Sequence, residues 1–271
     1  MINNPVLRKE LLLRFRMRQP TPTRIGLGLL ITLGLGWMYW AGMSRLLSDA
    51  SPAAGRDAWM VAIWIQYLII CLVAPSLTAN AITQEKEQQT WEMLVFTRLQ
   101  PAEIVLGKLL ARLVTVGLIL GICLPFTLFS WLHAAQGGPA SPSFISPWQF
   151  GIAYLVMLLS ALFFATLSLF LSLALKRTLY VIVLAYVLVI GVLCIGTALI
   201  TALLSSIVQD YNLFDHSPLM WFNPIRLIWA AMAPNEPGNS AVLLAGLFGY
   251  AAATLLLLAH MITRFPRFAH E

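Results

Sequence analysis

Apolar residues fill six long runs of the chain, and polar residues gather in the stretches between them. The runs are Ile25–Met43, Ala58–Leu77, Ile104–Leu132, Trp148–Leu175, Leu179–Ser205 and Ser240–Ile262. A helix needs about 20 apolar residues to cross the hydrocarbon core of a bilayer, whereas a barrel strand alternates in polarity over only about 9–11 residues. The pattern predicts an all-α, polytopic membrane helix bundle of six transmembrane helices, forming a single domain over residues 1–271.

Two stretches outside the runs have their own patterns. Residues 1–23 are basic and place Leu7, Leu11 and Phe15 four residues apart, which predicts an amphipathic elbow helix at the lipid headgroups; a disordered basic tail is the alternative. Within the outer loop 206–239, the segment Leu219–Ala233 is too apolar for a solvated loop, and Pro224 interrupts it. It predicts one or two short helices that dip into the outer leaflet or pack as a lid over the bundle.

Composition supports a membrane protein. The chain of 271 residues is 59% apolar and 10% charged, compared with about 45–50% and about 25% in soluble domains. Little room is left for a separate soluble domain. Most of the basic residues behind the net charge of +6 lie in the stretches between the runs, so the charge does not indicate nucleic-acid binding.

Lysine and arginine predict the orientation, because cytoplasmic loops of membrane proteins are enriched in both. With the N-terminus inside, fourteen basic residues are cytoplasmic and three are external. The external ones are Arg45, Arg56 and Arg226. Most tryptophans then fall near the outer ends of the runs, as expected for interfacial side chains. We expect a protein of the cell (inner) membrane with both termini cytoplasmic.

The spans lack the groups that drive several classes of membrane protein. Their cores contain no Asp, Glu, Lys or Arg, which argues against proton-coupled transport and voltage gating. Lys108 and Arg112 lie near the inner end of the third run, where we expect their side chains to reach the headgroups. The scattered histidines and the three cysteines suggest no catalytic or metal site.

A phosphate-binding loop is also missing. Gly107-Lys108 is the only Gly-Lys pair, and the loop motif would need glycine at 102 and Ser or Thr at 109, where the chain has Ala102 and Leu109. We therefore expect no catalytic residue, no cofactor bound by this chain and no ATPase activity of its own.

The cytoplasmic segment 78–103 holds four of the eleven carboxylates, Glu85, Glu87, Glu92 and Glu103. It is the one place where a soluble partner would find a charged surface. By itself, the pattern favours a solvated helix face.

This segment resembles the stretch between the second and third spans of ABC-2 type ABC transporter permeases. Those proteins read I-x-x-E-[RK]-E-x-G-T-x-E-x-L, then a turn with proline, then E-I-x-x-G-K. The matching residues are Ile82, Glu85, Lys86, Glu87, Thr90, Glu92, Leu94, Pro101, Glu103, Ile104, Gly107 and Lys108. Two positions depart from the pattern. Gln89 replaces the usual glycine, which suggests a more continuous helix, and Arg98 replaces a frequent proline.

The resemblance implies a membrane subunit of an ATP-driven exporter. In that family the segment is a coupling helix that docks on a separate ABC ATPase subunit, which binds the ATP, and the permease works as a homodimer or paired with a sister permease. Trp91, Met93 and Leu94 would supply apolar anchorage, and Glu85, Glu87 and Glu92 would set the register against basic ATPase residues. Pro101, Glu103, Gly107 and Lys108 would form the entry to the third span.

The alternative is a polytopic membrane protein that does not transport, either a scaffold or a membrane-embedded enzyme. An enzyme needs polar residues gathered at one membrane depth, and no such cluster is visible in the sequence. Co-purification of an ATPase distinguishes transporter from scaffold. The pattern does not identify the substrate.

Overall fold

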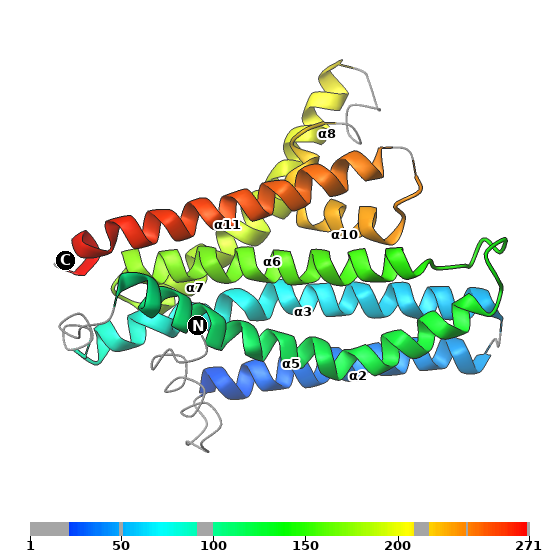
Figure 1. Cartoon of the computed structure of the whole chain (residues 1–271), viewed down its shortest axis with the longest axis horizontal. Helices are drawn as coiled ribbons and strands as arrows, with labels where there is room; N and C mark the ends of the chain where they lie inside the picture. Colours follow the sequence, from blue (N-terminus) through cyan, green and yellow to red (C-terminus); the bar gives the residue numbers. More distant parts are fainter. Residues whose placement is uncertain (1–21, 49–50, 91–99, 209–216, 237, 270–271) are drawn as a thin grey trace.

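The computed structural model describes residues 22–48, 51–90, 100–208, 217–236 and 238–269. These residues form helices and short connections and contain no strand. Most of the helices run along one long axis (Figure 1). Their bounds are α2 Pro22–Ser48, α3 Pro52–Glu87, α5 Pro101–Ala135, α6 Pro147–Ala174, α7 Thr178–Tyr186, the π-helix η1 Val187–Gly196, α8 Thr197–Val208, the 3₁₀-helix η2 Met220–Phe222, α10 Pro224–Met232 and α11 Asn239–Ala269.

Five spans in the described part of the chain are long and apolar enough to cross a membrane. They are α3, α5, α6, the continuous α7–η1–α8 and α11, and each covers one predicted run. The remaining run lies in α2, a helix of 27 residues. The structure thus confirms a multi-pass all-helical protein, while the count of six spans and the orientation of the termini stay predictions. The predicted elbow helix lies almost entirely outside the described residues.

Proline defines where several helices begin. Pro52, Pro101, Pro147 and Pro224 each occupy the first turn, where a missing N–H costs nothing because that donor has no intrahelical partner. At three of these starts the preceding residue, Ser51, Ser146 or Asn223, accepts hydrogen bonds from the first turn. The sequence therefore encodes these boundaries locally.

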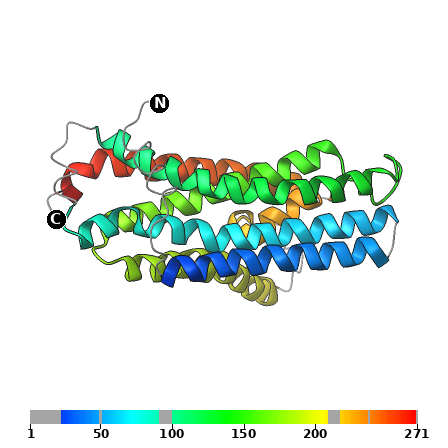
Figure 2. The same cartoon turned by 90° about the horizontal axis from the view of Figure 1, so that it is seen from below.

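Helix α3 is the centre of the bundle and is flanked by α2, α5 and α6 (Figures 1 and 2). Trp59, Ile63 and Tyr67 of α3 are buried in one apolar cluster together with Phe164 of α6 and Tyr250 of α11. Helix α2 approaches closely because Gly42 lacks a side chain: a Cβ there would lie 2.4 Å from the ring of Phe126. At the other end of α3, Ala81 and Ile82 are buried in a second apolar cluster with residues of α5, α6 and α11, so the most polar end of α3 lies among several spans.

Three serines of α6 hydrogen-bond to α3 along its length. Ser160 accepts from Tyr67 Oη at 3.1 Å, and Ser168 donates to the Pro75 carbonyl at 2.7 Å. Ser172 Oγ accepts from the backbone N–H groups of Ile82 and Thr83 at 3.1 and 3.0 Å. In a bilayer, where water does not compete, such bonds link α3 and α6 into one unit.

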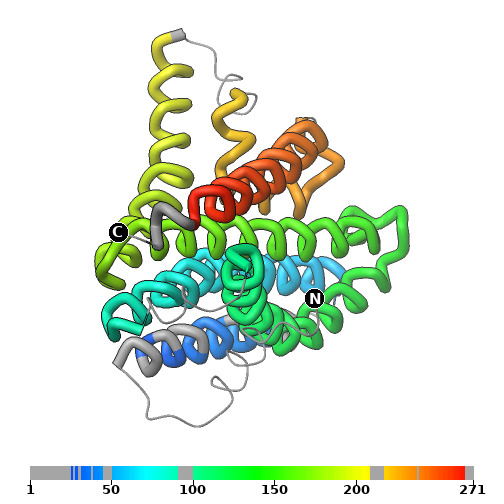
Figure 3. Tube along the Cα trace, turned by 60° about the vertical axis from the view of Figure 1, so that its left-hand side comes forward, coloured from blue at the N-terminus to red at the C-terminus, as the bar shows by residue number. Residues whose placement is uncertain are grey.

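The fifth span leaves the bundle. It begins against α3 and α6 as α7, continues through the ten-residue π-helix η1, and ends as α8, which diverges from the other helices (Figures 1 and 3). Leu199, Leu203 and Ile207 of α8 are exposed. π-helices are rare, mostly a single turn long and frequently at functional sites, so this ten-residue stretch distinguishes the fifth span from the others.

The apolar segment before α11 forms the two short helices η2 and α10. Leu227, Ile228 and Ala231 of α10 are buried against the bundle. Residues 209–216 and 237 of the outer loop lie outside the described part.

Candidate coupling junction

Helix α3 ends in a turn that satisfies its last carbonyl groups. The N–H of Gln89 donates to the Lys86 carbonyl at 3.1 Å, and the N–H of Thr90 donates to the Glu85 carbonyl at 2.9 Å. Gln89 has φ 56°, in the left-handed region that this type of helix end requires. The expectation that Gln89 makes the helix more continuous is therefore wrong. Gln89 adopts the left-handed conformation that glycine usually takes at such a helix end, and α3 stops at Glu87.

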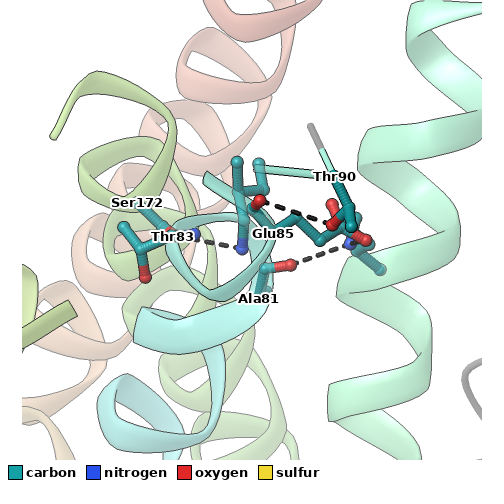
Figure 4. A network of polar contacts seen from close by, with 7 residues as sticks. Ala81, Thr83, Glu85, Thr90 and Ser172 are labelled. Carbon is teal, nitrogen blue, oxygen red and sulfur yellow. Dashed lines mark hydrogen bonds and ion pairs between the residues drawn. The ribbon is translucent and has the colours of Figure 1, made fainter. Parts of the chain in front are cut away.

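Glu85 and Lys108, from the two halves of the motif, form an ion pair. Glu85 Oε1 lies 2.8 Å from Lys108 Nζ, which also donates to the Ala81 carbonyl at 2.8 Å. Lys108 is 1% exposed and the Glu85 side chain 21%. The other carboxylate oxygen, Oε2, is buried without a hydrogen-bond partner in the described chain. Figure 4 shows Ala81 and Glu85 on the last turns of α3. The pair joins α3 to α5.

This geometry corrects the expectation that Lys108 and Arg112 extend to the headgroups. Both side chains are buried, with Arg112 9% exposed. A buried ammonium needs an anionic or carbonyl partner, and Glu85 and Ala81 provide both. Gly107, next to Lys108, is buried as well.

Lys86 binds the end of α6. Its Nζ donates to the carbonyl groups of Leu173 and Leu175, which lie where α6 stops at Ala174. A cation at a helix C-terminus satisfies free carbonyl groups and complements the negative end of the helix dipole.

Glu87 binds the start of α7. Its Oε1 accepts from the Thr178 N–H at 2.8 Å, so an anion lies at the positive end of that helix. Thr83 Oγ1 also lies 2.7 Å from Thr178 Oγ1. Successive residues of a helix point about 100° apart, and so Glu85, Lys86 and Glu87 reach α5, α6 and α7 in turn. We call these three residues the coupling junction.

Pro101 and Glu103 form the start of α5. Pro101 is its first residue, and the Glu103 carboxylate accepts from the N–H of Gln100 at 3.1 Å. The entry motif therefore has two parts: Pro101 and Glu103 build the helix start, and Gly107 and Lys108 lie in its interface with α3.

The structure brings together part of the predicted site. Glu85, Lys86, Glu87 and Lys108 share one cluster, and Thr90 closes the turn that follows. Trp91, Glu92, Met93 and Leu94 lie outside the described residues, so their predicted contacts with an ATPase stay predictions. No group of three or more His, Cys, Asp or Glu side chains in the described ranges is arranged to hold a metal ion.

The sequence analysis missed Thr83, Ser172 and Thr178. The first and last share a hydroxyl pair, and Ser172 binds the backbone of α3 beside it (Figure 4). Their signal was present but weak: Thr178 follows the basic pair Lys176-Arg177, and Ser172 interrupts an apolar run. Single hydroxyls are common in membrane helices, so neither stood out.

Comparison with known families decides the class of protein. The chain matches the model of the ABC-2 family transporter protein over residues 8–267. The chain belongs to this ABC-2 transporter family. It is a multi-pass permease subunit of an ABC transporter, and membership implies pairing with an ABC ATPase subunit. No curated protein matches the chain.

Proposed function

We propose that this ABC-2 permease is the membrane subunit of an exporter, driven by ATP that a separate ATPase subunit hydrolyses. Membership of the family implies an ATPase partner, and the coupling junction would connect that partner to the helices of the bundle. The resemblance described above supports outward transport.

The observation that carries the proposal is the connection of Glu85, Lys86 and Glu87 to three different helices. A displacement of the segment after Glu87 would pull on α5, on the end of α6 and on the start of α7 at once. Because α3 and α6 are also joined by serine hydrogen bonds, the displacement would move these helices as one body. The cores of the spans lack Asp and Glu, which favours such an external drive over a proton-coupled one.

In this proposal, the residues that follow the coupling junction contact the ATPase. Trp91, Met93 and Leu94 would give apolar anchorage, and Glu92 would pair with a basic ATPase residue. Glu85 has its ion partner, Lys108, inside the chain, which favours a role in transmission over one in docking. Glu87 is exposed and holds Thr178 through one oxygen, so it is able to serve both purposes.

The proposed assembly contains two permeases and two ATPases, as a homodimer or with a sister permease, in the inner membrane with both termini cytoplasmic. Each permease has six spans, with α2 as the first. ATP binding would close the ATPases, move the two coupling segments and rock the spans of the two permeases apart.

Co-purification of the ATPase tests this proposal. Trp91→Ala removes an aromatic anchor, and such anchors contribute about 2 kcal/mol or more to an interface. Glu87→Lys places a like charge opposite a basic partner. We expect both variants to reach the membrane at the level of the parent, to bind the ATPase poorly and to lose transport.

Ala140→Ser, in the exposed connection between α5 and α6, is the matched control and should retain the ATPase. Full ATPase binding and full transport by both test variants would show that segment 78–103 is not the coupling segment. A chain that never co-purifies with an ATPase would support the scaffold alternative.

A further inference from the structure

Helix α10 begins deep inside the bundle. The Phe222 carbonyl, just before it, accepts from Tyr250 Oη at 2.9 Å, and the Tyr250 ring lies 4.8 Å from that of Phe163. Phe163 is 16 residues from the start of α6, about 24 Å along that helix. Asn223 Nδ2 donates to the Cys194 carbonyl at 3.0 Å, near the middle of the fifth span. The first turn of α10 is therefore beside the middle of three spans.

The other end of α10 lies at the end of the bundle. The Met232 carbonyl accepts from Gln149 Nε2, two residues after α6 begins at Pro147. Arg226, three residues after Asn223, thus lies among the spans and only about 5 Å along the helix from the deep end. The sequence analysis predicted an outer-loop position for this arginine, whereas the fold brings it close to the middle of the spans.

Two guanidinium nitrogens of Arg226 have no partner in the described chain. Nε and Nη1 are both buried and make no hydrogen bond there. A buried charge without a partner is costly, and intramembrane arginines normally pair with an acid or with backbone carbonyl groups. The cores of the spans offer no acid: residues 22–48, 58–84, 104–208 and 239–269 contain no Asp or Glu, and Asp57 lies near the start of α3. Glu236 lies beyond the far end of α10, where it contacts Asn239 at 3.4 Å.

The side chains around Arg226 are apolar and open to the surroundings. Ile225 and Trp229 of α10 are 49% and 43% exposed, and the Trp229 ring lies 6.4 Å from that of Trp64 on α3. This surface suits hydrocarbon, whereas the guanidinium suits a phosphate or carboxylate.

We propose that Arg226 binds the anionic group of an acidic amphiphile whose apolar tail lies along Ile225 and Trp229. The further statement that such amphiphiles are the transported substrates rests on the proposed export function. The shared chemistry is a phosphate or carboxylate on a hydrocarbon tail. An anionic membrane lipid and a distinct lipid-like substrate both have it.

Binding to the purified permease, without ATPase, tests the site separately from export. Dodecyl phosphate titrated into the protein in dodecyl maltoside should quench tryptophan fluorescence, because Trp229 and Trp64 lie beside the site. Arg226→Gln should weaken binding about tenfold or more, as expected for loss of hydrogen bonds to a charged group. Arg226→Lys should weaken it less. Inorganic phosphate, which has no tail, should not compete.

Arg56→Gln is the matched control, because Arg56 lies near the start of α3 and already donates to the Pro142 carbonyl at 2.6 Å. It should bind like the parent. The loss caused by Arg226→Gln should persist when Asp210 and Asp215, in the segment before η2, are both changed to asparagine. Equal binding by the parent and Arg226→Gln, or loss of the difference in that background, would overturn the proposal.

Nanodiscs distinguish the two sources. If membrane lipid is the ligand, phosphatidylglycerol in phosphatidylcholine nanodiscs should compete with dodecyl phosphate for the parent. If only a distinct substrate binds, dodecyl phosphate should bind equally well in phosphatidylcholine nanodiscs with and without phosphatidylglycerol. Both results require Arg226 and so support the site. If the permease binds the amphiphile through Arg226 but never recruits an ATPase, the binding site is supported and only the proposed export function is refuted.

Discussion

Two residues decide the local geometry at the end of α3. Gln89 accepts a left-handed conformation so that the N–H groups of Gln89 and Thr90 can close the helix, and Lys108 is buried against Glu85 so that α5 is held at the same level. Neither contact follows from residue type alone, because glutamine rarely has a positive φ and lysine side chains are usually exposed. Both residues thus adopt an environment or conformation that is unusual for their type.

Replacing Gln89 by glycine should stabilise the protein. A side chain in the left-handed region costs about 1 kcal/mol, which glycine avoids. We expect a higher midpoint in thermal unfolding of the detergent-purified permease. Gln88→Gly is the control and should not raise the midpoint, because Gln88 has a negative φ of −87°. A lower midpoint for Gln89→Gly would contradict the described helix end.

Lys108→Met should destabilise the junction. It leaves the Glu85 carboxylate without its ion partner in a largely buried position, and breaking a fully buried pair costs about 3–5 kcal/mol. Because Glu85 is 21% exposed, we expect the lower part of that range. The double variant Glu85→Gln/Lys108→Met should recover much of the loss in the same unfolding measurement. Additive losses would show that the two side chains are not coupled.

Elements were predicted well wherever the pattern is long. The apolar runs became helices, and proline is the first residue of five described helices, α2, α3, α5, α6 and α10. Three residues of the motif, Glu85, Lys86 and Glu87, contact neighbouring helices at the end of α3, while their role in coupling stays a prediction. The sequence could not predict which residues pair between different helices, because such pairs depend on which helices are neighbours. Examples are the contacts of Lys86 with the end of α6, of Glu87 with the start of α7, and of the Thr83 and Ser172 hydroxyls. The ten-residue π-helix has the same composition as an ordinary apolar span, so it left no signal.

The capping of α7 by Glu87 gives a prediction at this scale. Glu87→Ala removes the acceptor of the Thr178 N–H, and loss of such a cap costs about 1 kcal/mol. Amide hydrogen exchange at residues 178–181 should therefore become about fivefold faster. Glu87→Gln keeps a side-chain oxygen and should have a smaller effect. Unchanged exchange in Glu87→Ala would mean that the cap does not stabilise α7.

At the scale of the whole molecule, we expect the coupling junction to lie on the cytoplasmic side, the side on which most Lys and Arg residues are predicted to lie. The connection between α5 and α6 then lies outside. Ser143 in that connection is 6% exposed, and its hydroxyl lies 2.7 Å from that of Ser141, so a cysteine there would be a poor probe of topology. Ala140 is exposed and serves better.

Cysteine at Ala140 should react with an impermeant reagent in intact cells, and cysteine at Gln88 should react only after the membrane is opened. The native Cys71 and Cys123 are buried and should contribute little background. The reverse labelling pattern would place the junction outside and refute the coupling function.

The central claim is that Lys86 and Glu87 transmit movement from a docked ATPase to the spans. The most direct measurement is the distance between two spin labels in the permease–ATPase complex, with and without trapped ATP. One label is at Ala140, in the connection after α5, and the other is at Ile207, in the last turn of α8. The parent should show a nucleotide-dependent change. Lys86→Ala/Glu87→Ala, with Trp91 and Glu92 intact, should still bind the ATPase and hydrolyse ATP but show no change. A parent-like change in this variant would contradict the account.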